Sequence, residues 1–176
     1  MAYILIDGYN LIGTAHGNLE KARNELIEQL QEYSRIKQHD ITLVFDGWKN
    51  GQRDQTRTKA AHVTVIYSRL GETADVAIRK MLTPDAKPWI VVSSDREIYD
   101  YAARKDFAAV SSDEFEDKLF RALHEDSGSI PHMQTGDENL MKYYDDEDDH
   151  SPDRFKGNPR KLSKKDKKKQ QALKKL

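Results

Sequence analysis

Three aspartates that follow apolar segments are the first candidates for chemistry in this chain. Asp7 ends the run "AYILID", Asp46 ends "ITLVFD", and Asp95 closes "WIVVSSD". Short, uninterrupted apolar runs are typical of strands buried on both faces of a parallel sheet. Because the carboxyl ends of such strands meet at the edge where α/β sheets bind ligands, we expect these carboxylates to converge.

A fourth carboxylate belongs to the same expected site. Asp75 lies one turn inside a helix predicted near 72–82, in "GETADVAI", and Glu72 precedes it by three residues on the same face. Carboxylates that lie close together repel one another, and a divalent cation removes that conflict. The chain has no cysteine and no histidine pair at metal-binding spacing. The expected cofactor is therefore Mg²⁺ or Mn²⁺, which orients phosphates and activates water.

Neutral groups are expected at the same edge. Gly8 would allow a close approach of backbone, and Asn10 would contact a phosphate or a metal-bound water. Ser93 and Ser94 add hydroxyl groups next to Asp95. These residue types are suited to orienting a phosphate or a water molecule beside a metal.

Each aspartate also has a purely local explanation. Asp46 with Gly47 is typical of a turn, Asp95 is typical of a helix start, and Asp75 is four residues from Arg79, as in a helical ion pair. The interpretation as a metal or phosphate site therefore depends on their convergence, because no single residue requires it.

The surrounding elements predict an α/β fold with a mostly parallel sheet and right-handed crossovers. Strands are expected at Tyr3–Ile6, Ile41–Phe45, Val63–Tyr67, Trp89–Val92 and Ala108–Val110. Helices are expected at about 19–37, 72–82 and 95–104, and again after the capping box "SSDE". This domain is expected to end near residue 125.

Charge is strongly segregated in the rest of the chain. The net charge is -1, yet residues 137–153 hold eight acidic residues against one lysine, and residues 154–176 hold eleven lysines and arginines against one aspartate. We predict a disordered acidic linker at 126–153 and a basic tail at 154–176 that is disordered alone or helical on an anionic partner. The N-terminus lacks a signal-peptide pattern and no apolar run is long enough to span a membrane, so the expected location is the cytoplasm.

The motifs "LIDGYNLI", "LVFDG", "GETADVAIRKM" and "VVSSDREI" occur in this order within residues 1–125. Together they resemble the NYN domain, and specifically the YacP-like family of the PIN-like nuclease superfamily. The resemblance implies a three-layer α/β/α fold, divalent-metal-dependent cleavage of RNA and a bacterial origin. Some YacP-like proteins are described as ribosome-associated mRNA endonucleases, so mRNA and the ribosome are the implied partners.

The resemblance also implies roles for individual residues. The family's first aspartate corresponds to Asp7, its amide to Asn10, its helix acid to Asp75, and the acid of its "SSD" motif to Asp95. Asp46 lies at the family's second strand end. Glu97 matches a further acid of PIN-like sites, or it is only the reach-back partner of a capping box.

Cations near this edge are the expected RNA contacts. Lys49, Arg53, Arg57 and Lys59 belong to a helix-compatible stretch at 48–61 that is expected to overhang the carboxylates, with Trp48 and Tyr9 available for base stacking and Arg69 next to "GETAD". In the tail, the expected contacts are Lys164, Lys165, Lys167, Lys168 and Lys169. The acidic segment would compete with RNA for these lysines.

The sequence therefore predicts a metal-dependent RNA endonuclease in which water attack leaves a 5′-phosphate and a 3′-hydroxyl. Asp7, Asp75 and Asp95 would hold the metal, while Asn10 and Ser94 would orient water or phosphate. A non-catalytic RNA- or ribosome-binding protein with the same fold is the main alternative. A small α/β phosphohydrolase is a further one, although Tyr9 stands where that chemistry usually needs a second aspartate.

Overall fold

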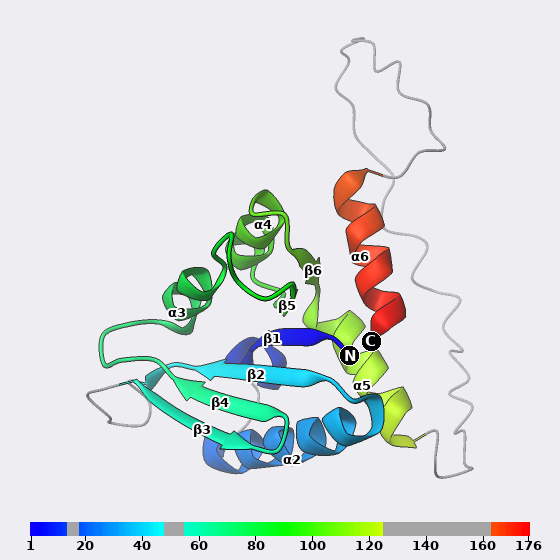
Figure 1. Ribbon diagram of the computed structural model, residues 1–176. Coiled ribbons are helices and arrows are strands. Elements are labelled where there is room, and N and C mark those ends of the chain that lie inside the picture. The colour runs from blue at the N-terminus through cyan, green and yellow to red at the C-terminus, as the bar shows by residue number, and fades with distance from the viewer. Residues whose placement is uncertain (14–17, 48–54, 125–162) are drawn as a thin grey trace, which may run out of the picture.

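The computed structural model describes residues 1–13, 18–47, 55–124 and 163–176. Its centre is a six-stranded sheet in the order β3-β4-β2-β1-β5-β6 (Figure 1). The strands are β1 (Tyr3–Asp7), β2 (Asp40–Phe45), β3 (Thr56–Ala60), β4 (Val63–Tyr67), β5 (Trp89–Val92) and β6 (Ala108–Val110). All neighbours pair in parallel except β3 and β4. The α/β fold and the five predicted strands are confirmed.

Helices cover both faces of the sheet, which gives the expected three layers. The helices are α1 (Gly8–Ile12), α2 (Leu19–Lys37), α3 (Ala74–Met81), α4 (Arg96–Arg104), α5 (Ser112–His124) and α6 (Lys164–Lys175). Side chains alternate across β1, because successive residues of a strand point to opposite faces. Ile4 and Ile6 pack in one core with residues of α2, α5 and α6. Leu5 packs in the other core with α3 and α4.

The strand β3 was not predicted. Residues 56–60 were expected to continue a helix-compatible stretch, but they pair antiparallel with β4 and form an edge of the sheet. An edge strand with an exposed outer side needs no apolar run. Its sequence, "TRTKA", instead alternates β-branched threonine with exposed Arg57 and Lys59, and charges on an edge strand discourage pairing with another chain.

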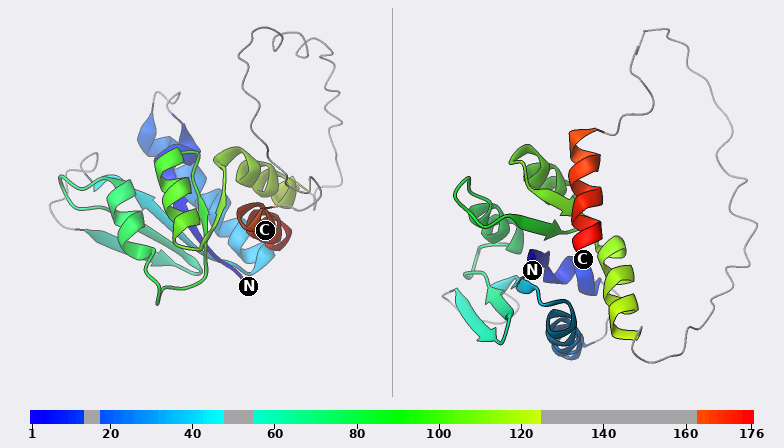
Figure 2. Two further views of the ribbon diagram at one scale, coloured as in Figure 1. Left: turned by 90° about the horizontal axis from the view of Figure 1, so that it is seen from above. Right: turned by 45° about the vertical axis from the view of Figure 1, so that its right-hand side comes forward.

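The helix α6 also differs from the prediction that the tail is disordered unless a partner is bound. Residues 164–175 form a helix alongside β6 and α5 (Figure 2). Ala172 and Leu176 are buried in the same core as Tyr33 of α2, and Leu173 packs against it. The few aliphatic residues of this segment are thus spaced so that they lie on one helical face, which the body of the domain covers. The predicted linker at 126–153 lies outside the described residues.

Among the described residues, no helix has the length and apolar character needed to cross a lipid bilayer.

Gly8 is required by packing. A Cβ atom at this position would lie 2.2 Å from the ring of Phe45, so the absent side chain makes room for an aromatic residue. This contact indicates a packing role for Gly8. It does not support the expected role of Gly8, which was to let backbone approach a ligand closely.

Replacing Gly8 by alanine should therefore lower the free energy of unfolding by about 1–3 kcal/mol, which is the usual cost of overpacking. Urea unfolding would measure the loss. The same substitution made in a Phe45→Leu background should cost less, because the ring that causes the clash is gone. Equal costs in the two backgrounds would contradict this assignment.

Candidate active site

Four carboxylates lie at the carboxyl edge of the sheet, and we call them the carboxylate edge: Asp7, Asp46, Asp75 and Asp95. Asp7 ends β1, Asp46 directly follows β2, Asp75 lies in the first turn of α3, and Asp95 caps α4 after β5. An open pocket is lined by Asp7, Asp46 and Asp75 together with Asn10. Asp95 lies close enough to repel Asp7 and Asp75 electrostatically. The fold thus brings together residues that are far apart in the sequence.

Asp7 has the most unfavourable environment for a charge. Its side chain is 6% exposed, and burial raises its pKa to about 6 from an ordinary 3.8. The Asn10 backbone N–H, which donates to Asp7 Oδ1 at 3.3 Å, opposes this rise. Repulsion from Asp75, Asp46 and Asp95 adds to it. A nearby cation would relieve both the burial cost and the repulsion.

Asp75 shares this environment to a smaller degree. Burial is the main cause of its raised pKa, and repulsion from Asp95 is the next. Arg79 acts in the opposite direction. However, the Arg79 guanidinium makes its ion pair with Glu97, at 2.8 Å, and not with Asp75. The helical ion pair with Arg79, which was the alternative local explanation for Asp75, is therefore not formed.

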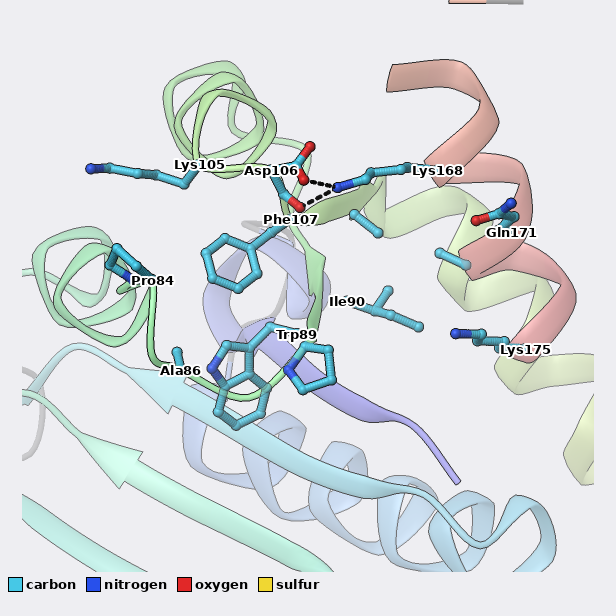
Figure 3. A pocket seen from close by; sticks show the side chains of 13 residues that line it. Pro84, Ala86, Trp89, Ile90, Lys105, Asp106, Phe107, Lys168, Gln171 and Lys175 are labelled. Carbon is cyan, nitrogen blue, oxygen red and sulfur yellow. Dashed lines mark hydrogen bonds and ion pairs between the residues drawn. The ribbon is translucent and has the colours of Figure 1, made fainter. Parts of the chain in front are cut away.

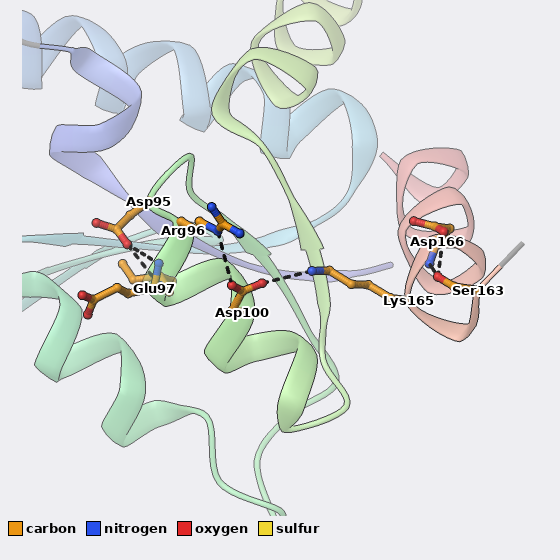
Figure 4. Close-up of polar contacts among 8 residues, drawn as sticks. Asp95, Arg96, Glu97, Asp100, Ser163, Lys165 and Asp166 are labelled. Atoms are coloured by element: carbon orange, nitrogen blue, oxygen red, sulfur yellow. Dashed lines mark hydrogen bonds and ion pairs between the residues drawn. The ribbon is translucent and has the colours of Figure 1, made fainter. Parts of the chain in front are cut away.

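Asp46 and Asp95 each use one oxygen to hold a helix. Asp46 Oδ1 accepts a hydrogen bond from the Ala74 backbone N–H at the start of α3. Asp95 Oδ1 accepts from the N–H groups of Glu97 at 2.6 Å and Ile98 at 3.2 Å (Figure 4). The local role and the site role are compatible, because a carboxylate has a second oxygen that can accept.

The two glutamates near the site each form an ion pair. Glu97 pairs with Arg79 at 2.8 Å, and its charge lies close enough to Asp75 to contribute to the raised pKa of that carboxyl. Glu72 pairs with Lys80 at 2.7 Å.

The donor chemistry of the carboxylate edge suits Mg²⁺ or Mn²⁺, which prefer hard oxygen ligands. In the described ranges none of the four aspartates forms an ion pair within 4.0 Å. No group of three or more acidic or histidine side chains is assembled as metal ligands in the part of the chain that the structure describes. The residues thus fit a divalent cation in chemical type and in charge, while a three-ligand geometry is not formed.

The predicted RNA contacts from the sheet lie on two exposed segments. Arg57 and Lys59 point to the same face of β3, two positions apart. Arg57 pairs with Ile66 and Lys59 with Thr64, so Arg57 is the nearer of the two to the carboxyl end of β4. Arg69 is exposed just beyond that end. Trp48, Lys49 and Arg53 lie outside the described residues.

The predicted RNA contacts from the tail are largely held by the body of the domain. Lys165 pairs with Asp100 at 3.1 Å (Figure 4). Lys168 contacts the side chain and the carbonyl of Asp106, at the rim of a pocket that Trp89 and Phe107 also line (Figure 3). Two further pairs are Lys164–Asp106 at 3.2 Å and Lys169–Glu114 at 2.8 Å. Lys167 is exposed. The lysine cluster therefore contributes mainly to docking α6.

A mostly parallel sheet between two layers of helices, with carboxylates at its carboxyl edge, defines a three-layer α/β domain with an acidic candidate site. Within that class, the chain belongs to the YacP-like NYN domain family, whose model matches residues 4–156. The predicted family is thereby confirmed.

Known proteins named YacP are similar to this chain in sequence and in structure. "Uncharacterized protein YacP" of Bacillus subtilis is 33% identical over 90 residues, which are 46% of this chain and 51% of that protein. The match thus spans about half the length of this relative. A crystal structure of Rae1 (YacP) from Bacillus subtilis is similar with a TM-score of 0.54 at 26% identity, covering 72% of this chain and 78% of that one. A crystal structure of a mutant of the same Bacillus subtilis protein matches with a TM-score of 0.58 at 24% identity, covering 71% and 79%, and supports the fold.

Proposed function

We propose that this protein is a divalent-metal-dependent RNA endonuclease. The observation that carries the proposal is the carboxylate edge of a YacP-like NYN domain, where Asp7, Asp46 and Asp75 line one pocket beside Asn10. The reaction class is hydrolysis of a phosphodiester by water, which leaves a 5′-phosphate and a 3′-hydroxyl.

Asp7, Asp75 and Asp95 would hold Mg²⁺ or Mn²⁺, with Asp46 as a further oxygen donor. When bound, the metal supplies an activated water and neutralises charge on the phosphate. The protein's own contribution is positional. Backbone N–H groups at the starts of α3 and α4 hold one oxygen of Asp46 and of Asp95, and the buried Asp7 is positioned as the last residue of β1.

Single-stranded RNA is the proposed substrate, and mRNA on the ribosome is the proposed context. Exposed cations on β3 and after β4, at Arg57, Lys59 and Arg69, lie on the β3–β4 side of the sheet, and β4 neighbours the strand that Asp46 follows. They would hold phosphates to one side of the scissile one, because a polyanion approaching four carboxylates needs compensating positive charge. The cytoplasm is the proposed location.

The alternative is an RNA-binding protein that keeps this fold and does not cleave. One observation favours it: no three-ligand metal group is assembled in the described residues. In this case the exposed cations would bind RNA, and the carboxylates would have a structural role at the helix starts.

Incubation of the purified protein with labelled single-stranded RNA separates the two proposals. We expect cleavage with Mn²⁺ or Mg²⁺, none with EDTA, and recovery when the metal is restored. Products should carry 5′-phosphates. An absence of cleavage with either metal, with ribosomes present and with RNA demonstrably bound, would favour the non-catalytic alternative.

Neutralising the exposed cations tests the substrate surface. Arg57→Gln together with Arg69→Gln should weaken RNA binding several-fold and reduce the slope of log affinity against log salt by about 1.4, because each of the two lost phosphate contacts to a single strand contributes about 0.7. The control is Lys118→Gln on α5. This helix follows β6, which lies at the opposite edge of the sheet from β3. An unchanged salt slope in the double variant would remove these arginines from the RNA surface.

A further inference from the structure

The side-chain amide of Asn10 is held in one orientation by two donors. Its Oδ1 accepts hydrogen bonds from the Ser94 backbone N–H at 2.8 Å and from the Ser112 hydroxyl at 2.9 Å. A backbone N–H can only donate, so the amide atom that faces Ser94 must be the oxygen. The amide nitrogen therefore points away from both serines.

Ser112 is the residue that closes this arrangement. It is 3% exposed and begins α5, directly after the loop that follows β6. Its backbone N–H donates to Ser94 Oγ at 3.0 Å, while its hydroxyl donates to Asn10. One buried residue thus ties α1, the loop after β5 and the start of α5 to one another. The sequence pattern "SSDE" indicated only a helix start here.

The orientation decides what Asn10 can bind. Within residues 1–13, 18–47, 55–124 and 163–176, no hydrogen bond from Asn10 Nδ2 is formed. Asn10 lines the same pocket as Asp7 and Asp75. An amide that presents only N–H groups donates to an acceptor such as a phosphate oxygen, and its nitrogen is not a ligand for a hard cation. A neutral N–H donor can bind a phosphate oxygen without adding to the negative charge of the neighbouring carboxylates.

We infer that Ser112 is a positioning residue, which turns the Asn10 amide so that Nδ2 donates to a phosphate oxygen of the RNA substrate. The inference rests on the proposed function, and it deepens it in two ways. Asn10 contacts the phosphate and not the metal. Ser94, which was expected to orient water or phosphate, acts through its backbone N–H and its acceptor oxygen to fix Asn10.

Ser112→Ala tests this role in the full-length protein. The variant leaves the Ser94 N–H as the single donor to the Asn10 oxygen, so the amide is held less firmly in its orientation. We expect kcat for cleavage of single-stranded RNA to fall about ten- to a hundredfold, with KM within about twofold. Asn10→Asp should lose cleavage as well, because an oxygen that accepts replaces the N–H groups while the bonds from Ser94 and Ser112 can persist.

The matched control is Ser34→Ala. Ser34 is also a buried serine, at 2% exposure, and its hydroxyl donates to the His39 carbonyl at 2.6 Å, outside the carboxylate edge. This variant should lose a similar amount of stability and keep the parent kcat. A parent-like kcat for Ser112→Ala, or an equal loss of kcat for Ser34→Ala, would overturn the inference.

A second readout does not need turnover. The Asn10 side-chain amide resonances, assigned by their loss in Asn10→Asp, should shift when a short single-stranded RNA is added with Ca²⁺ in place of Mg²⁺. In Ser112→Ala the shift should be lost. If the parent cleaves nothing but this pattern holds, the proposed function fails and the positioning role stands. If the amide of the parent does not respond to RNA, the positioning role fails regardless of activity.

Discussion

Replacing Asp7 by asparagine should remove RNA cleavage and, at the same time, stabilise the metal-free protein at neutral pH. The expected loss of activity is at least about a hundredfold, since a charged oxygen donor at the proposed metal site is lost. The fold should persist, because an asparagine side chain can still accept the Asn10 N–H bond that Asp7 accepts now.

The gain in stability follows from the pKa of Asp7. Burial raises this pKa to about 6 in the folded protein, compared with an ordinary 3.8. Folding therefore favours the protonated carboxyl. Its stabilising contribution is complete below pH 3.8 and is lost as the pH rises through about 6. A difference of this size corresponds to about 3 kcal/mol, which asparagine avoids because it carries no charge.

Urea unfolding in EDTA would measure this effect as the difference between the variant and the parent. We expect Asp7→Asn to be more stable by about 2–3 kcal/mol at a pH of about 7.5 and nearly equal below a pH of about 4. Taking the difference is necessary because Asp100, Asp106 and Glu114 have lowered pKa values, which contribute stability of the opposite pH dependence. Asp85→Asn, in an exposed turn, is the control that should change little at either pH.

The metal reverses this order of stability. Ligands that bind the folded state raise its stability by mass action, so Mg²⁺ or Mn²⁺ should raise the Tm of the parent and leave that of Asp7→Asn nearly unchanged. A variant that is less stable than the parent in EDTA at the higher pH would contradict the burial argument. An equal metal-dependent rise in Tm for both proteins would contradict the assignment of Asp7 as a ligand.

Removing α6 should destabilise the whole domain, in contrast to the effect expected for a disordered tail. A chain that ends before residue 163 would lose the buried Ala172 and Leu176. It would also uncover the part of the core that contains Tyr33 and Phe115. We expect the free energy of unfolding to fall by about 3–5 kcal/mol, from the apolar surface exposed on both sides of the contact.

Two hydrogen bonds to the end of the helix make its position specific. The Tyr33 hydroxyl donates to the Leu176 carbonyl at 2.9 Å. His39 Nε2 lies 2.9 Å from the Lys175 carbonyl and donates to it, while its Nδ1 accepts from the Ala2 N–H at 3.3 Å. The truncated protein would lose both acceptors. The surface ion pairs of the helix are expected to add less, because exposed pairs are screened by solvent.

Matched variants distinguish packing from charge in α6. Leu176→Ala should reproduce a substantial part of the loss, whereas Lys167→Gln and Lys174→Gln, which change lysines outside the ion pairs described above, should leave the urea midpoint nearly unchanged. If α6 also contacts RNA, those two lysine variants should weaken RNA binding without affecting stability. A truncated protein that unfolds at the parent's urea concentration would show that the helix is not part of the fold.

Local sequence patterns were sufficient to predict β1 but not the packing of α6. The run at β1 is apolar throughout and is bounded by Asp7, so a local pattern was sufficient to predict a buried strand and the edge at which it ends. In α6, lysines dominate, and few aliphatic residues were available. Their burial depends on contact with β6 and with the core that α5 and α2 share, which no local pattern describes. The strand β3 was missed for a related reason. It is held by hydrogen bonds to β4 and has no apolar run of its own that could be recognised in the sequence.

By itself, the sequence determined the five main strands, the α/β class, the family motifs and the edge at which Asp7, Asp46 and Asp95 lie, because apolar runs and their carboxyl ends are local features. The tertiary structure alone decided that Asp46 and Asp95 each give one oxygen to a helix start, that Ser112 fixes Asn10, and that Tyr33 binds a helix 143 residues away in the chain. These contacts join segments that are distant in sequence, and their geometry exists only when the sheet has placed the segments side by side.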